Sequence, residues 1–312
     1  MSRPETASAA PRGLLRRLFD VFRAPKDQVM GMNRRNLDMI YPRNPRLHFT
    51  LVNHKLKTKA ILSAVGLPVA PTLATVDGFH QLAELEARLA GLEEFVIKPA
   101  NGSGGKGIIV VAAKDGDSYV TAGGRRLGPA QVRKHVADIV FGVYTFDKAD
   151  VAVVEPRLHP DPFFASLYPD GLSDIRVITV DGTPVLSMIR VPTKASDGRA
   201  NLHQGAIGLG LDLATGRVVQ ARKKGVTVEV HPDTQAQLVG QQVPFWPDIL
   251  DICRRGAKAI PLGYLGFDIV VDRTRGPTVL EVNARPGLEI QNVTGIPLRG
   301  LLRRLGLAET GA

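Results

Sequence analysis

Hydrophobic residues recur along this chain with two different spacings. Some segments repeat them every three to four residues, which places them on one face of a helix. Others are short β-branched runs bounded by glycine, proline and polar residues, which predicts strands. The predicted helices cover residues 55–65, 78–89, 129–138 and 247–259, and the predicted strands cover residues 72–75, 151–154, 175–180, 185–191 and 226–230.

Two further strand pairs carry polar residues suited to chemistry, and the first lies near the C-terminus. Strands expected at residues 267–271 and 278–282 flank a polar turn, so a hairpin would bring Asp268 beside Glu281. Side chains alternate along a strand, so Glu281 and Asn283 share a face. Hard oxygen donors of this kind suit Mg²⁺, with Mn²⁺ as an alternative, although an acidic hairpin on a solvated surface would look the same.

The second pair surrounds a glycine loop. An apolar run at residues 95–97 ends at Lys98, and the glycine-rich residues 102–107 lead into the β-branched run 108–111. Dinucleotide-binding and P-loop motifs both need a helix after the glycines, and no helix pattern follows here. A glycine hairpin instead resembles the flap that covers nucleotide phosphates, with a simple polar turn as the alternative.

Four segments in order resemble the RimK-like, glutamate-ligase-like group of ATP-grasp ligases. Together they extend over residues 51–295, about four fifths of the chain. The matching segments are residues 52–71 with Lys55, Lys98 with its glycine loop, residues 174–205, and residues 266–288.

The resemblance implies an α/β (α+β) fold in which two α+β lobes clamp ATP. A basic, mainly helical segment (1–50) would stand in place of a full preceding α/β domain, followed by an N-lobe (51–155) and a C-lobe (156–308). Asp268, Glu281 and Asn283 would hold the metal. The residues implied for ATP binding are Lys55, Lys98, Gly102, Ser103, Gly104, Gly105, Lys106, Gly107 and Glu155.

The resemblance also implies amide formation through an acyl phosphate, from an amino acid such as glutamate, or another carboxylate, and an amine or peptide acceptor. Bidentate cations suit carboxylate and phosphate, which makes Arg176, Arg190 and Arg285 the candidates. Asn201 and His203 resemble the stretch that contacts acceptor and acyl phosphate, and His203 could accept a proton from the amine. Surface ion pairs and a structural hydrogen bond are the alternative interpretations.

The chain also departs from the family pattern. Only 54 residues precede Lys55, so we expect the usual N-terminal domain to be truncated or replaced. His54 stands where many relatives have an acid, and Pro156 follows Glu155 where they often have a polar residue. An aromatic segment at residues 160–172 is expected either as an insertion over the site or as ordinary loop packing.

Positive charge is concentrated at the N-terminus. The formal net charge is +10, and residues 1–60 hold thirteen Lys and Arg against four Asp and Glu. Apolar residues between 14 and 22 fall at helical spacing with arginines among them, which predicts an amphipathic helix for an anionic membrane surface or an acidic protein. Packing on the chain's own catalytic domain is the alternative. No nucleic-acid-binding signature accompanies the charge, so nucleic acid is not the expected partner.

Length and composition limit the possible size of the core, the disulfides and the membrane segments. At 312 residues and 44% hydrophobic residues, the chain can bury a substantial core in two or three subdomains. A single cysteine, Cys253, excludes an internal disulfide and is expected in the core. No apolar run suits a membrane span or a secretory signal, so the expected location is cytoplasmic, or peripheral at the inner membrane surface.

Three functions therefore remain open at this level. The first is an active carboxylate–amine ligase that uses ATP and Mg²⁺. The second is a nucleotide-binding regulatory or docking protein that works through its basic arm without turnover. The third is a small-molecule kinase with the same phosphate flap. The retained lysines and metal ligands favour catalysis, because a scaffold has no physical need for them.

Overall fold

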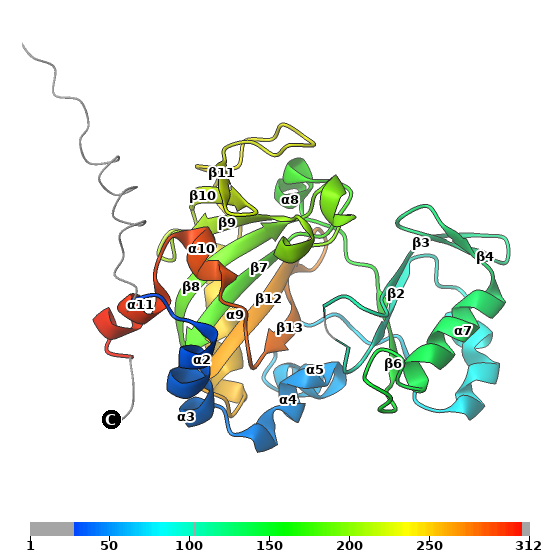
Figure 1. Ribbon diagram of the computed structural model, residues 1–312. Coiled ribbons are helices and arrows are strands. Elements are labelled where there is room, and N and C mark those ends of the chain that lie inside the picture. The colour runs from blue at the N-terminus through cyan, green and yellow to red at the C-terminus, as the bar shows by residue number, and fades with distance from the viewer. Residues whose placement is uncertain (1–27, 103, 308–312) are drawn as a thin grey trace, which may run out of the picture.

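Two antiparallel sheets organise the chain into a larger and a smaller lobe, which lie side by side in Figure 1. The computed structural model describes residues 28–102 and 104–307. Each lobe has its own cluster of buried hydrophobic side chains. The predicted α+β class is therefore confirmed, whereas the three-part division at residues 50 and 155 stays a prediction.

The smaller lobe is a six-stranded sheet in the order β1-β6-β2-β3-β4-β5. Helix α7 (Pro129–Val140) packs on β2 and β6, beside a 3₁₀ turn (Phe79–Glu84) that leads into α6 (Leu85–Leu89). The strands are β1 (Ala74–Val76), β2 (Phe95–Pro99), β3 (Ile109–Asp115), β4 (Ser118–Thr121), β5 (Arg126–Leu127) and β6 (Ala152–Pro156). Pairing of β2 with β3 confirms the hairpin predicted around the glycine loop.

The larger lobe is a seven-stranded sheet in the order β11-β10-β9-β8-β7-β12-β13. Helix α9 (Trp246–Ala259) packs on β7, β8 and β12, and helix α10 (Glu289–Thr294) packs on β8, β9 and β10. The strands are β7 (Asp174–Val180), β8 (Thr183–Val191), β9 (Ile207–Leu211), β10 (Val218–Lys223), β11 (Val226–Val228), β12 (Tyr264–Asp272) and β13 (Gly276–Asn283). The two helices cover opposite faces, because α9 approaches Phe267 and α10 approaches Gly208.

The described part of the N-terminal segment packs against the larger lobe. Met39 and Ile40 are buried in its core, and Asn44 bonds to the backbone of Tyr264 and Ala284. Its helices are α2 (Met32–Arg35), a π-helical turn (Asn36–Ile40), α3 (Tyr41–Arg43) and a 3₁₀ turn (Arg46–His48). The next helices, α4 (Thr50–Asn53) and α5 (Lys55–Ala64), contact β13 of the larger lobe. The amphipathic helix expected between residues 14 and 22 lies outside the described residues.

Most predicted elements are present, with informative exceptions. Residues 78–89 divide into a 3₁₀ turn and the short α6, and β9 and β10 have no counterpart among the predicted strands. The sequence of β9 is Ile-Gly-Leu-Gly-Leu. Glycine is needed at position 208 because a Cβ there would lie 2.4 Å from Val293 of α10. Close packing therefore selected glycines that weaken the local strand signal.

The aromatic segment at residues 160–172 is part of the core. It contains helix α8 (Pro162–Leu167), which starts at the Asp161 cap, and Phe164 and Leu167 are both 2% exposed within the larger lobe. These buried side chains agree with the alternative of ordinary packing, and an insertion over the site stays a prediction.

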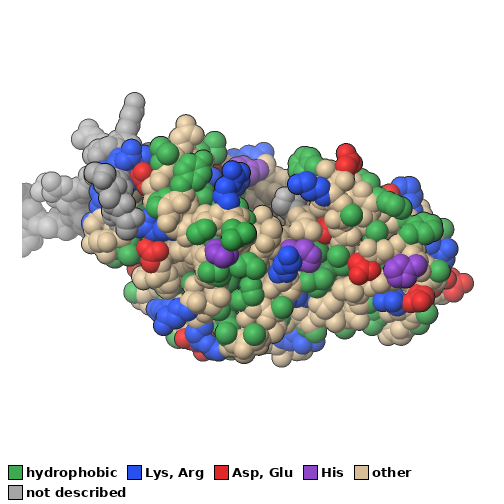
Figure 2. Space-filling model, turned by 90° about the horizontal axis from the view of Figure 1, so that it is seen from below, with side chains coloured by type: hydrophobic (Ala, Val, Ile, Leu, Met, Phe, Trp, Pro, Cys, Tyr) green, Lys and Arg blue, Asp and Glu red, His purple; other side chains and the backbone are tan. Residues whose placement is uncertain are grey.

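Charged side chains show no single extended patch on the face in Figure 2, where basic, acidic and apolar groups are interspersed. No helix among residues 28–102 and 104–307 combines the length and apolar character needed to cross a membrane. Cys253 is buried, and burial raises the pKa of its thiol, in agreement with the expected packing role.

Candidate functional site

The acid-bearing hairpin forms as predicted. Asp268 of β12 lies directly opposite Glu281 of β13, and the register shifts by one residue after Asp268. Asn283 follows two residues after Glu281 and so shares its face. Asn283 Nδ2 donates to Asp268 Oδ2 at 3.2 Å, so the three predicted metal-site residues lie together.

Two of the predicted arginines contact this hairpin. Arg176 lies opposite Asp268 on β7 and donates to both of its carboxylate oxygens, at 2.7 and 2.6 Å. Arg190 of β8 reaches the same carboxylate at 3.0 Å. Neighbouring antiparallel strands present opposite residues on one face, which is why these far-separated side chains meet.

Asp174 completes the cluster and was not among the predicted site residues. Its carboxylate accepts two hydrogen bonds from Arg190, one of them from Nε at 2.6 Å. Burial raises the pKa of Asp174, although Arg190 opposes that shift. Burial alone would lower the pKa of Arg190, but Asp174 and Asp268 together raise it above its ordinary value. We call Asp174, Arg176, Arg190 and Asp268 the arginine–aspartate cluster.

The donor set of the hairpin fits a hard divalent cation. No group of three or more His, Cys, Asp or Glu side chains suits a metal within the described ranges 28–102 and 104–307. Asp268, Glu281 and Asn283 instead offer two carboxylates and one amide, and Mg²⁺ commonly uses one or two carboxylates together with water and phosphate oxygens. Asp268 already accepts four hydrogen bonds, three from arginine nitrogens and one from Asn283, and a carboxylate has about four lone-pair sites, so a cation bound to Asp268 would replace one of these donors.

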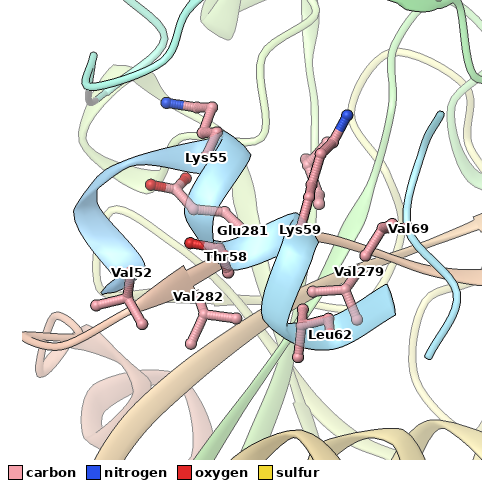
Figure 3. A pocket seen from close by; sticks show the side chains of 10 residues that line it. Val52, Lys55, Thr58, Lys59, Leu62, Val69, Val279, Glu281 and Val282 are labelled. Carbon is pink, nitrogen blue, oxygen red and sulfur yellow. The ribbon is translucent and has the colours of Figure 1, made fainter. Parts of the chain in front are cut away.

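Lys55 lies between the hairpin and the glycine loop. It begins helix α5, and its Nζ donates to the backbone oxygen of Gly102 at 2.6 Å. Lys55 and Glu281 both line a water-sized cavity of about 10 Å³ between α5 and β13, where Figure 3 shows them on neighbouring elements. Burial lowers the pKa of Lys55, with Glu281 opposing the shift.

Two further lysines, Lys59 of α5 and Lys98 of β2, share one carboxylate. Lys98 Nζ is 2.6 Å from Glu155 Oε2, and Lys59 Nζ contacts the other oxygen of the same carboxylate. Lys98 and Glu155 are 4% and 3% exposed, so the carboxylate is buried between two ammonium groups. Lys59 was not among the predicted site residues, yet its position four residues after Lys55 places both on one side of the helix. We call Lys59, Lys98 and Glu155 the lysine–glutamate cluster.

Both ends of the glycine loop are held by side chains that were not predicted. At its start, Asp150 accepts from the backbone and side-chain nitrogens of Asn101, at 3.0 and 2.7 Å. At its end, His135 Nε2 lies 2.9 Å from the Gly107 oxygen, and the Tyr144 hydroxyl lies 3.2 Å from His135 Nδ1.

The loop itself depends on glycine. Gly104, Gly105 and Gly107 have φ values of 66°, 76° and 73°, in the left-handed region that other residues rarely adopt. A Cβ on Gly107 would also lie 2.7 Å from the Tyr144 ring. Lys106 is exposed on this turn, and Ser103 lies outside the described residues.

The other predicted catalytic residues lie elsewhere. Arg285 is exposed, and its guanidinium carbon lies 4.8 Å from the centre of the Phe49 ring. The Asn201 side chain accepts a hydrogen bond from the backbone nitrogen of His203 at 3.0 Å. This bond caps the start of a 3₁₀ turn (Leu202–Gln204). His203 lines a different depression from Lys55.

Comparison with known proteins gives a family match over most of the chain. Residues 34–306 match the model of the family described as sugar-transfer associated ATP-grasp. A probable alpha-L-glutamate ligase of Maridesulfovibrio salexigens is 27% identical over 266 residues, covering 84% of this chain and 66% of that protein. A ribosomal protein bS6--L-glutamate ligase of Salmonella paratyphi B is 25% identical over 263 residues, covering 83% and 65%. The chain thus spans just under two thirds of these relatives.

Solved structures give matches of similar extent. The D-cycloserine synthetase DcsG has a TM-score of 0.45 and 15% identity, covering 84% of this chain and 72% of that one. A D-alanine--D-alanine ligase from Bacillus anthracis has a TM-score of 0.43 and 15% identity, covering 81% and 66%. The family match extends over both hairpins and the helix that carries Lys55, and it confirms the ATP-grasp resemblance: this chain belongs to the sugar-transfer associated ATP-grasp family.

Proposed function

We propose that this protein is an ATP-dependent, ADP-forming carboxylate–amine ligase that works through an acyl phosphate. The contact of Lys55 Nζ with the Gly102 oxygen carries the proposal, because Lys55 also lines a cavity with Glu281. This arrangement supports a shared cleft between the glycine loop and the acid-bearing hairpin, with the ammonium group of Lys55 between them. The glutamate-ligase names of the relatives make an amino acid such as glutamate the first candidate substrate.

The proposed nucleotide site lies on the lysine side of this cleft. Lys55 and Lys98 would bind the phosphates, and the backbone of the glycine loop would cover them. Glu155 holds Lys98 beside the site and is itself shared with Lys59. Lys59 and Lys98 share the single buried carboxylate of Glu155, which leaves net positive charge in this part of the cleft and suits a polyphosphate.

The proposed cation is Mg²⁺, with Mn²⁺ acceptable to the same oxygen donors. Asp268, Glu281 and Asn283 would hold it. Such a cation supplies positive charge to the phosphate oxygens when bound. Burial and Asp268 raise the pKa of Glu281, with Lys55 opposing the shift, which is the environment of a carboxylate that needs a cationic partner.

The arginine–aspartate cluster would orient the reacting groups. A substrate carboxylate oxygen forms a bond to the γ-phosphorus while the bond from that phosphorus to ADP breaks. The amine nitrogen then bonds to the acyl carbon, the carbon–oxygen bond to phosphate breaks, and the nitrogen loses a proton. Arg176 and Arg190 have planar guanidinium groups fixed by two carboxylates, so they could stabilise the charge on these oxygens without reorganising.

An ADP-release assay with pairs of carboxylates and amines tests the proposal. We expect release of ADP and phosphate that requires both substrates and ceases when EDTA removes the divalent cation. Phosphorylation of a single substrate would favour the small-molecule kinase, and ATP binding without turnover would favour the regulatory protein. The basic N-terminal arm as a docking element for an anionic membrane surface or an acidic protein stays a separate prediction.

A further inference from the structure

Four large apolar side chains are exposed on the smaller lobe. Phe79 lies in the 3₁₀ turn before α6, and Phe141, Val143 and Phe146 follow α7; all four are between 60% and 95% exposed. The Phe79 and Phe141 rings lie 6.4 Å apart, and the 3₁₀ turn packs beside α7. The other two belong with Phe141 to the turn of residues 141–150, which leads from α7 to β6 (Figure 1). We call these four side chains the apolar patch.

The 141–150 turn is fixed by its own backbone. The nitrogen of Asp147 donates to the oxygen of Gly142 at 3.1 Å, and a Cβ on Gly142 would lie 2.4 Å from the oxygen of Lys148. Phe146, at the tip, has φ 56°, a left-handed conformation that bulky residues rarely adopt. Strain of this kind persists only where the surrounding structure imposes it, and it concentrates at functional positions. The most exposed ring of the patch is therefore presented by a preformed turn.

The same turn also holds the glycine loop. Tyr144 lies against Gly107, where a Cβ would be 2.7 Å from its ring, and its hydroxyl contacts His135, which contacts the Gly107 oxygen. Asp150, at the other end of the turn, accepts from Asn101 at the start of the loop. A change in the mobility of the turn would therefore reach both ends of the glycine loop.

Charge around the apolar patch is close to balanced, in contrast to the chain as a whole. Residues 77–90 and 129–150 hold four Lys and Arg against six Asp and Glu, whereas the whole chain has a formal net charge of +10. Three of these acids are held in ion pairs with three of these bases. The pairs are Arg88–Glu84, Arg133–Glu86 and Lys134–Asp138. Two positively charged copies of the chain would therefore repel each other least where these regions meet.

A second copy of the same chain suits this patch better than a partner of other chemistry. Because a large aromatic side chain can bury about 150–250 Å², the patch exposes on the order of 500 Å² of apolar surface. That area is more than half of the roughly 800 Å² that each partner contributes to a standard interface. A two-fold contact joins identical patches, apolar centre to apolar centre, with paired charges at the rim. An anionic membrane or an acidic protein would instead require an excess of basic residues.

From these observations we infer that the apolar patch is the contact of a two-fold symmetric dimer, and that this contact stabilises the glycine loop. The patch of the partner covers Phe141 and Phe146, so the 141–150 turn loses mobility. Tyr144 and Asp150 then hold the two ends of the loop more firmly. The dimer goes beyond the proposed function and does not depend on it; only the consequence for ATP binding does.

Sedimentation velocity on the full chain, from low to high micromolar concentration, tests the dimer. We expect a reversible monomer–dimer equilibrium in wild type. Phe146→Gly removes the ring but suits the left-handed backbone, so the turn is kept. We expect Phe146→Gly and Phe141→Ser each to weaken dimerisation by about tenfold, as loss of a central aromatic contact does. Leu47→Ser is the matched control, because Leu47 is 82% exposed in the N-terminal segment, outside the patch; we expect a change below about twofold.

Amide hydrogen exchange in residues 101–107 tests the coupling. We expect slower exchange in wild type at high concentration, where the dimer forms, than at low concentration. A wild type that stays monomeric throughout, or an equal loss of dimer in Leu47→Ser and Phe146→Gly, would overturn the dimer. A dimer with unchanged exchange in the loop would overturn the coupling. Binding of Mg-ATP is measured on the same samples, and its absence from an intact dimer would count against the proposed function alone.

Discussion

The lysine–glutamate cluster and the arginine–aspartate cluster belong to the same proposed site but differ in charge balance. The first places two ammonium groups on the single carboxylate of Glu155, with the ammonium of Lys55 nearby. The second pairs two guanidinium groups with two carboxylates. Burial lowers the pKa of Lys59, whereas the paired aspartates more than offset burial and raise the pKa of Arg176 and Arg190.

This difference separates two tasks. The lysine–glutamate cluster has more ammonium groups than carboxylates, and burying this excess charge is costly. A bound polyanion would offset that cost, so this cluster suits the triphosphate. A charge-balanced, hydrogen-bonded cluster is already satisfied and stays fixed, so the arginine side suits the orientation of reacting groups. Glu281 lies between them, beside Asp268 and near Lys55.

The largest expected effect comes from removing the acid between the two clusters. We expect Glu281→Ala to lower the rate of ADP release by about a thousandfold, because the divalent cation loses a carboxylate ligand. Circular dichroism and thermal melting should show an intact fold. Glu229→Ala, which removes an exposed carboxylate next to β11, is the control. Wild-type rates in Glu281→Ala would refute the metal assignment.

Removal of one ionic partner should reduce stability more in the arginine–aspartate cluster than in the lysine–glutamate cluster. We expect Arg190→Met to reduce the free energy of unfolding by about 3–5 kcal/mol, because Asp174 loses its cationic partner while buried. Lys59→Met should reduce it by less than Arg190→Met does, because Glu155 keeps Lys98 as its cationic partner. Urea denaturation measures both. Arg190→Met/Asp174→Asn should recover part of the loss; if it is no more stable than Arg190→Met, the unpaired aspartate is not the cause.

Within the lysine side, Lys98 and Lys59 should differ in ATP binding. Lys98 is on β2 beside the glycine loop, whereas Lys59 is a full turn of α5 beyond Lys55. We expect Lys98→Met to raise the KM for ATP by about a hundredfold and Lys59→Met by about tenfold, in line with hydrogen bonds to charged groups worth about 1.5–3 kcal/mol. Equal effects would mean that both lysines contact the nucleotide.

The smallest effect concerns the end of the glycine loop. Burial lowers the pKa of His135, with its bond to Gly107 opposing the shift. A histidine whose folded-state pKa is depressed contributes stability above the ordinary value of 6.5, and that contribution is lost as the pH falls through the folded-state pKa. Wild type should therefore lose more unfolding free energy than His135→Asn between pH 7 and 5, measured by urea denaturation. Parallel pH profiles would argue against this role.

Local patterns were sufficient for the helix that carries Lys55, for both hairpins and for the pairing of Asp268 with Glu281. They missed Asp150, His135 and Lys59, which act through partners that are distant in sequence. Asp150 contacts a residue 49 positions earlier, and no local periodicity encodes such a contact. The glycines of β9 weakened its strand signal because they were selected by the approach of α10.

The sequence by itself determined the two hairpins, the residue types that they present and the family to which the chain belongs. Only the tertiary structure decided that Arg176 and Arg190 converge on Asp268, that Lys59 shares Glu155, and that His203 lines a separate depression. Local spacing sets which face of a strand a side chain occupies. Strand order and register across the whole sheet set which side chains meet, because β12 becomes the neighbour of β7 only after the long chain between β8 and β12 has folded.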